Sequence, residues 1–170
     1  MVLFLSYKVK SLSHVTATVL YILYAALSGV TFSVIFLAYA KSTIQSAFFI
    51  TSFAFAGLSA FGYFTKKDLG PIGTFCSMGL FGLIGFGLMS MFFPSLMGPT
   101  ASHVYGLVGL LVFSGLTAYD TQKIKNGNII GNEGTSENHK ETIMGALTLY
   151  LDFINLFLMI LRLMNGGRKN

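Results

Sequence analysis

The longest uncharged stretch of the chain constrains its fold most strongly. From Leu69 to Tyr119 the sequence contains no Asp, Glu, Lys or Arg. A helix of about 20 apolar residues crosses the hydrocarbon core of a bilayer, so this stretch is long enough for two crossings. Pro94, Gly98 and Pro99 divide it, because proline lacks the amide hydrogen and disfavours helix at the preceding residue. The sequence therefore predicts membrane-spanning helices near 72–93 and 102–124.

Three other apolar stretches complete the pattern. Two of them end at charged residues, Lys41 and the Lys66–Lys67–Asp68 cluster, and the third follows a polar segment over 126–141. These stretches predict helices near 14–39, 43–65 and 142–163. A membrane β-barrel is not indicated, because its strands would alternate polar and apolar residues. The predicted fold class is all-α, a polytopic membrane bundle of about five helices that forms one domain over residues 1–170.

The composition agrees with a membrane location. Only 10% of the residues are charged, against roughly 25% in ordinary soluble domains. The net charge of +5 does not indicate a nucleic-acid partner, because the basic residues lie singly or in pairs between apolar stretches, as they do at membrane flanks. The single cysteine, Cys76, excludes an internal disulfide framework and is interpreted as a small buried hydrophobic residue.

The distribution of basic residues predicts the orientation, since cytoplasmic connections carry an excess of Lys and Arg. A cytoplasmic N-terminus places seven of the eleven basic residues inside: Lys8, Lys10, Lys66, Lys67, Lys123, Lys125 and Lys140. The C-terminal basic residues are the exception, because Arg162, Arg168 and Lys169 lie outside if the last helix crosses fully. A re-entrant last segment is the alternative.

Small residues recur at every third position of the predicted helix near 72–93. They are Gly73, Cys76, Gly79, Gly82 and Gly85. This spacing keeps them near one face, where the backbone of a neighbouring helix can approach closely. We therefore expect the glycines from Gly79 to Gly85 to contact another helix.

Two carboxylates stand within predicted spans, and they are the candidate functional residues. Asp120 lies near the end of one span and Asp152 in the middle of the last. A charge deep in a span costs at least about 2.5–3.5 kcal/mol, so it normally faces the bundle interior or water. With a rise of about 1.5 Å per residue, Asp120 lies roughly 7 Å from its helix end and Asp152 roughly 15 Å into its own helix. Tilt and side-chain length can close that difference.

Two carboxylates held together tend to share one proton, so the pair is a candidate proton-operated latch. Other interpretations stay open. Asp120 alone can reach the membrane boundary beside Lys123, and Asp152 can be a neutral acid hydrogen-bonded to a neighbouring helix. Asn155 lies one turn beyond Asp152 on the same face and can support either role.

The sequence does not indicate an enzyme. His14, His103 and His139 are scattered, and their spacing does not match a zinc site. No serine falls in a recognisable motif with a histidine and an acid. We predict no catalytic residues, no resident metal and no cofactor.

Three segments resemble the transmembrane Bax-inhibitor-motif family, and the resemblance covers essentially the whole chain. GALTLYLDFINLFLMILRLM (145–164) resembles the family's last-helix signature, and GLTAYDTQKIK (115–125) resembles the end of the preceding helix. FTKKDLGPIGTF (64–75) is similar to a characteristic connection. The resemblance implies a seven-helix bundle in a bacterial cytoplasmic (inner) membrane, in which the last helix is sometimes described as re-entrant.

The resemblance also implies a function and a site. Family members are associated with a pH-sensitive calcium leak, and eukaryotic members with suppression of cell death. The family's two sensor aspartates match Asp120 and Asp152. A basic residue can pair with the first of them in bacterial members, and Lys8 or Lys10 is its candidate here. The family has about two more helices upstream, and MVLFLSY looks like the tail of its second helix, so this chain is expected to lack the first one or two.

Two alternatives to a calcium or cation leak remain. The first is a non-conducting regulator that binds other membrane proteins, such as proteases or cell-death factors. The second is a proton-coupled transporter, for which inverted repeats are expected. The sequence shows no such repeat.

Overall fold

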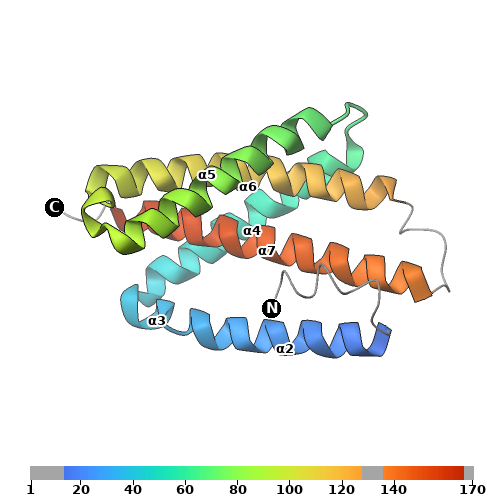
Figure 1. Cartoon of the computed structure of the whole chain (residues 1–170), viewed down its shortest axis with the longest axis horizontal. Coiled ribbons are helices and arrows are strands. Elements are labelled where there is room, and N and C mark those ends of the chain that lie inside the picture. Colours follow the sequence, from blue (N-terminus) through green and yellow to red (C-terminus); the bar gives the residue numbers. More distant parts are fainter. Residues whose placement is uncertain (1–13, 128–135, 167–170) are drawn as a thin grey trace.

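The computed structural model describes residues 14–127 and 136–166, and over these ranges the chain is helical without strands (Figure 1). The principal helices are α2 (His14–Phe32), α4 (Lys41–Phe64), α5 (Gly70–Phe92), α6 (Pro99–Asn126) and α7 (Ser136–Gly166). Two short elements, α3 (Ile35–Ala38) and η2 (Pro94–Leu96), lie in the connections after α2 and α5. Five segments are long and apolar enough to cross a membrane. The predicted fold class is confirmed.

The predicted boundaries were accurate for the middle helices and less so at the two ends of the chain. The first span is interrupted at Ser33, whose hydroxyl donates to the Val30 carbonyl at 2.6 Å. Such a side-chain bond to the local backbone competes with continuation of the helix. The last helix begins at Ser136, so the predicted loop over 126–141 is too long. Hydropathy detects only the membrane-embedded part of α7, whereas its polar first turns extend beyond it.

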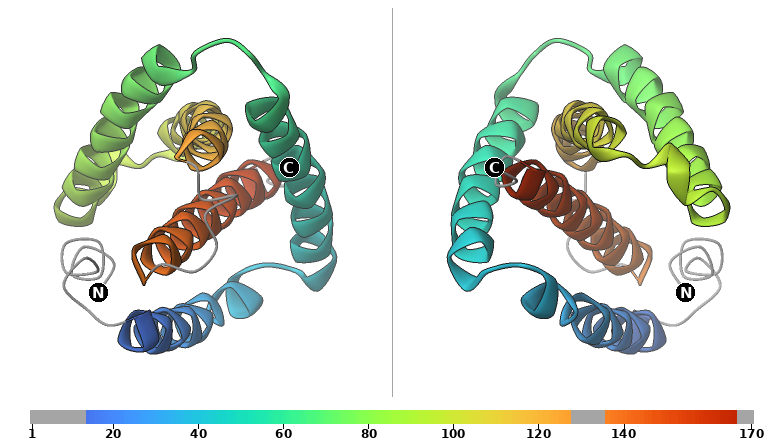
Figure 2. Two further views of the ribbon diagram at one scale, coloured as in Figure 1. Left: turned by 90° about the vertical axis from the view of Figure 1, so that its right-hand side faces the viewer. Right: turned by 90° about the vertical axis from the view of Figure 1, so that its left-hand side faces the viewer.

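Helices α6 and α7 form the centre of the bundle, and α2, α4 and α5 lie around them (Figure 2). The core consists mainly of apolar side chains from the two central helices, including Val112, Phe113, Leu116, Leu156 and Ile160. Large apolar side chains on the outer helices are exposed, for example Phe53 on α4 and Phe81 on α5. Helices satisfy their backbone groups internally, as hydrocarbon requires. Together with these exposed apolar side chains, the outer surface suits contact with lipid.

Helix α7 is one continuous helix whose segment Thr142–Asn165 is long enough to span a bilayer. A full crossing therefore fits this geometry better than a re-entrant segment. The end of the bundle that carries Lys66, Lys67, Lys123 and Lys125 is opposite the end that carries Arg162. Which end faces the cytoplasm stays a prediction from the charge distribution.

The glycine stripe of α5 packs over only half of its length. A Cβ at Gly73 would meet the ring of Tyr119, and one at Gly79 would lie 2.8 Å from Val112 Cγ2, so these two positions contact α6 closely. Gly82 and Gly85 have nothing within 4 Å of a built Cβ. The prediction that these two glycines contact a neighbouring helix was wrong. Helix α5 crosses α6 at an angle, so a stripe along one helix meets the other over a limited length (Figure 1).

A buried glutamine fastens the α4–α5 connection to α6. The Leu69 amide donates to Gln122 Oε1 at 2.9 Å, and Gln122 Nε2 donates to the Lys67 carbonyl at 2.8 Å. Nearby, Lys125 Nζ donates to the carbonyl of Tyr63 at 2.6 Å, in the last turn of α4, where carbonyls lack intrahelical partners. These bonds hold the segment 64–70 against the end of α6 that carries Asp120.

Replacing Gln122 with Ala is expected to destabilise the bundle. The change leaves the Leu69 amide and the Lys67 carbonyl without this partner, and an unsatisfied buried group costs about 1–3 kcal/mol. Thermal unfolding in detergent measures the effect. Gln45→Ala is the matched control, because Gln45 is exposed on α4. Equal unfolding midpoints for the two variants would show that the hydrogen bonds of Gln122 contribute little to the stability of the bundle.

Candidate functional site

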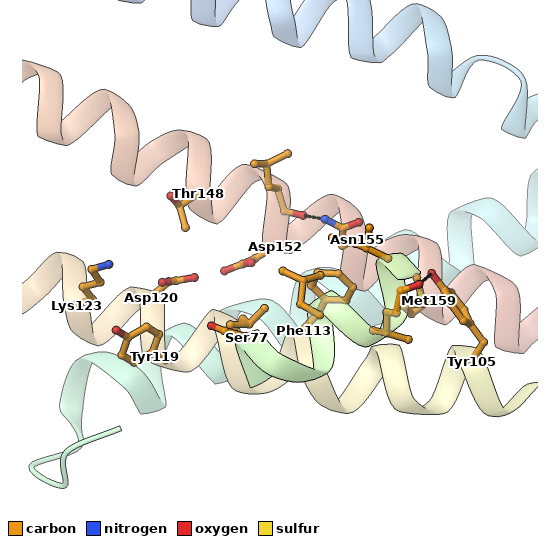
Figure 3. A pocket seen from close by; sticks show the side chains of 15 residues that line it. Ser77, Tyr105, Phe113, Tyr119, Asp120, Lys123, Thr148, Asp152, Asn155 and Met159 are labelled. Carbon is orange, nitrogen blue, oxygen red and sulfur yellow. Dashed lines mark hydrogen bonds between the residues drawn. The ribbon is translucent and has the colours of Figure 1, made fainter. Parts of the chain in front are cut away.

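A cavity of about 600 Å³ lies between α5, α6 and α7 (Figure 3). Its apolar wall includes Leu83, Phe113, Leu116 and Met159. Its polar lining consists of Ser77, Tyr105, Tyr119, Asp120, Lys123, Thr148, Asp152 and Asn155. A cavity of this size with polar groups in its lining has room for water.

The carboxyl groups of Asp120 and Asp152 point toward each other across this cavity (Figure 3). They are close enough for a side-chain hydrogen bond. Asp152 is only 5% exposed, and its Oδ2 receives no hydrogen bond from the residues that the structure describes. A carboxylate is an acceptor without a donor, so the two groups can bond to each other only when one of them carries a proton.

Lys123 lies close enough to Asp120 to act on it electrostatically. No ion pair between them is present in the described part of the chain, and Lys123 Nζ lies 5.9 Å from the centroid of the Tyr119 ring. The side chain of Asp120 is directed into the cavity toward Asp152. The geometry therefore favours an inward-facing carboxyl over one that only reaches the membrane boundary.

Three uncharged polar residues of the cavity are bonded to their own helices. Asn155 Nδ2 donates to the Leu151 carbonyl at 2.8 Å, Thr148 Oγ1 to Met144 at 2.9 Å and Ser77 Oγ to Gly73 at 2.7 Å. Each of these donors is thus already used by a backbone carbonyl. The oxygen atoms of these side chains retain the capacity to accept hydrogen bonds from water or to contact a cation.

A second cavity of about 370 Å³ adjoins the first. The two share Asp120, Lys123 and Thr148, and the second continues past Ile124 and Gly145 toward the end of α6. At its other end the first cavity reaches Tyr105 and Met159. Asp120 therefore lies where the two cavities meet, and Asp152 lines the first cavity beside it.

The structure brings some of the predicted site residues together. Asp120, Asp152 and Asn155 line one cavity, although Asn155 bonds to its own helix and not to either aspartate. Lys8 and Lys10 lie outside the described residues. The proton-sensing role of the pair stays a prediction. Among the described residues, no group of three or more His, Cys, Asp or Glu side chains could hold a metal ion.

Two residues near the site were not singled out from the sequence. The guanidinium carbon of Arg162 lies 4.8 Å from the centroid of the Tyr105 ring. Tyr105 in turn donates its hydroxyl to the Leu83 carbonyl at 3.3 Å and lines the cavity. The only sequence signal was an arginine at the end of an apolar stretch, which was read for topology alone.

Comparisons with known proteins identify what the chain is similar to. The family described as "Inhibitor of apoptosis-promoting Bax1" matches residues 1–169. The inner membrane protein YbhL of Escherichia coli (strain K12) is 43% identical over 169 residues, which are 99% of this chain and 71% of that protein. An uncharacterized protein of Rickettsia prowazekii is 44% identical over 154 residues, 90% of this chain and 63% of its own length.

A third bacterial relative is less similar in sequence to this chain. An uncharacterized membrane protein of Streptococcus pyogenes serotype M3 is 36% identical over 144 residues, which are 85% of this chain and 61% of that protein. The chain thus spans between 61% and 71% of the length of these three relatives.

Proposed function

Because the chain belongs to the family of inhibitors of apoptosis-promoting Bax1, we propose that it is a multi-pass inner-membrane protein that conducts cations, including calcium, under the control of Asp120 and Asp152. The inner-membrane location follows the name of its Escherichia coli relative, and five helices of membrane-spanning length support it. Ion conduction, pH control and the identity of the ion go beyond the family assignment and are the substance of the proposal.

One observation carries the proposal: two carboxyl groups from the central helices face each other inside a membrane-spanning bundle. Ionisable groups within spans are costly, and they commonly mark ion pathways or proton relays. A purely structural pair of helices could achieve the same contact with apolar side chains. The cavity around the pair supports a pathway, because it supplies hydroxyl and amide oxygens beside the carboxyl groups.

The number of protons held by Asp120 and Asp152 determines whether the pathway is closed or open. With one shared proton, a charge-assisted hydrogen bond joins α6 to α7, and such bonds are roughly twice as strong as neutral ones. Without that proton, two negative charges about 4 Å apart repel each other by about 4 kcal/mol at an effective dielectric constant of about 20. Loss of the proton therefore favours separation of the helices, and it also leaves two negative groups that attract a cation.

The chemistry of the lining suits a hard cation. Calcium takes 6–8 oxygen ligands, and the pair offers carboxylate oxygens with the hydroxyls of Ser77 and Thr148 nearby. Water would have to complete the coordination, since the described residues form no dedicated metal site. Incomplete coordination fits an ion that passes through, because conduction requires binding that is weak enough for the ion to leave.

Proteoliposomes that contain only this protein and a trapped calcium indicator test the proposal. We expect calcium entry at a rate that rises with the amount of protein. Asp68→Asn is the matched control, because Asp68 lies in the α4–α5 connection, where its Oδ1 accepts from the Gly70 amide at 2.9 Å, and Asn can keep that bond. This control should conduct like the parent.

Absence of flux from correctly folded protein would overturn the proposal and favour the non-conducting regulator. In that case the exposed apolar faces of α2 and α5 would be the surfaces available to other membrane proteins.

A further inference from the structure

A groove of about 600 Å³ runs between α5 and α6, on the part of α5 that does not pack. Its lining is apolar except for two hydroxyls, those of Thr100 and Tyr105: Gly79, Gly82, Leu83, Phe86, Thr100, Ala101, Val104, Tyr105 and Val108. The groove exists because Gly82 has no side chain and nothing lies within 4 Å of a Cβ built there. Its volume falls within the range of about 300–1,000 Å³ typical of ligand sites.

An arginine contacts Tyr105, one of the residues that line this groove. The Arg162 guanidinium stacks on Tyr105, which also lines the groove, and Arg162 Nη1 lies 3.7 Å from Met97 Sδ. Met97 and Tyr105 precede and follow the first turn of α6, so the guanidinium lies alongside that turn. No carboxylate pairs with Arg162 in the part of the chain that the structure describes. Stacking uses the face of the guanidinium and Nη1 donates to Met97 Sδ, so the other N–H groups on its edge remain to donate.

The start of α6 adds to the local positive potential. Gly98 precedes the helix without a side-chain cap, and Pro99 has no amide hydrogen, so the amides of Thr100 and Ala101 are the ones that lack this partner. The unpaired amides and the helix dipole favour an anion at this end. Phosphate suits this environment, because Arg binds phosphate oxygens with two parallel N–H groups.

We propose that this groove binds one anionic phospholipid, with an acyl chain between α5 and α6 and its phosphate group at Arg162 and the start of α6. Both helices are membrane-spanning, so the groove opens where lipid is the solvent. The acyl chain fills space that would otherwise be void. Lipid tails are as apolar as the groove, so the preference for this lipid comes from the phosphate contact and not from hydrophobic transfer.

Native mass spectrometry of the detergent-purified full chain tests the proposal, with phosphatidylglycerol and phosphatidylcholine as probes. We expect one phosphatidylglycerol per chain to bind the parent more tightly than phosphatidylcholine. Arg162→Ala should weaken the binding of phosphatidylglycerol about fivefold, the effect of one basic group on an anionic lipid, and should leave phosphatidylcholine unchanged.

A second pair of variants tests the acyl-chain contact. Gly82→Leu should displace both lipids by filling the groove, whereas Gly57→Leu should not, since Gly57 on α4 also faces open space but lies outside the groove. Equal binding of the two lipids by the parent, or full phosphatidylglycerol binding by Arg162→Ala, would overturn the proposal. These measurements do not depend on ion conduction, so they can fail or succeed independently of the proposed leak.

Discussion

Replacing Asp152 with Asn is expected to give a calcium flux that is low and no longer rises at high pH. The Asn amide is a donor at every pH, so it can hold a permanent hydrogen bond to the Asp120 carboxylate where the parent needs a shared proton. The parent should instead show a minimum of flux in the one-proton state. Its flux should rise at higher pH, where the two carboxylates repel, and more weakly at lower pH, where a neutral bond replaces a charge-assisted one.

The size of the effect follows from the strength of the bond. A hydrogen bond to a charged group contributes about 1.5–3 kcal/mol, and every 1.4 kcal/mol changes an equilibrium about tenfold. Because Asp152→Asn keeps the hydrogen bond to Asp120 at every pH, its calcium flux at high pH should be about tenfold to a hundredfold lower than that of the parent. Flux from proteoliposomes across a pH series measures it. Lys123 is the other charged side chain that lines the cavity, so Lys123→Gln should be measured alongside to separate its contribution.

Asp152→Ala distinguishes the latch from a simple need for an acid at this position. Alanine removes the link without a replacement donor, so this variant should conduct at the pH where the parent is closed. If Asp152→Asn keeps the parent's pH profile, or if the Asn and Ala variants behave alike, the shared proton is not the gate. The family assignment would be unaffected, because it does not rest on the gating mechanism.

The carboxyl pair could be predicted because charge is conspicuous in an apolar chain. Asp120 and Asp152 are the only acidic residues in the predicted spans near 102–124 and 142–163, and the cost of burying them indicates an interior position. The sequence alone does not show that the two carboxyl groups face each other. Counting residues placed them at different depths, whereas α7 is inclined against α6 (Figure 2) and the two carboxyl groups face each other (Figure 3).

Other features could not be predicted because their partners are distant in sequence or belong to the backbone. Gln122 bonds to the amide of Leu69 and the carbonyl of Lys67, and no pattern of side chains indicates a backbone partner. The glycine spacing in α5 predicted one continuous contact, but the crossing angle of α5 and α6, which the sequence does not encode locally, decides where that contact ends. The open end of the stripe is what creates the proposed lipid groove.

A close contact between α4 and the backbone of α6 leads to the second large effect, a severe loss of stability in Gly62→Ala. A Cβ at Gly62 of α4 would fall on the carbonyl oxygen of Ala118 in α6. That oxygen belongs to the backbone of a central helix and cannot rotate away as a side chain would, so α4 and α6 must separate. Overpacking of this kind costs about 1–3 kcal/mol or more.

Gly57→Ala is the control for Gly62→Ala, because Gly57 lies on the same helix with nothing within 4 Å of a built Cβ. This change should be neutral or stabilising, since Ala favours helix over Gly by up to about 1 kcal/mol. Unfolding in detergent compares the two variants, and similar midpoints would show that α4 and α6 are not in backbone contact. Ala118 lies two residues before Asp120, so moving α6 also moves one member of the carboxyl pair. Gly62→Ala should therefore shift the pH profile of the flux as well, whereas Gly57→Ala should leave it unchanged.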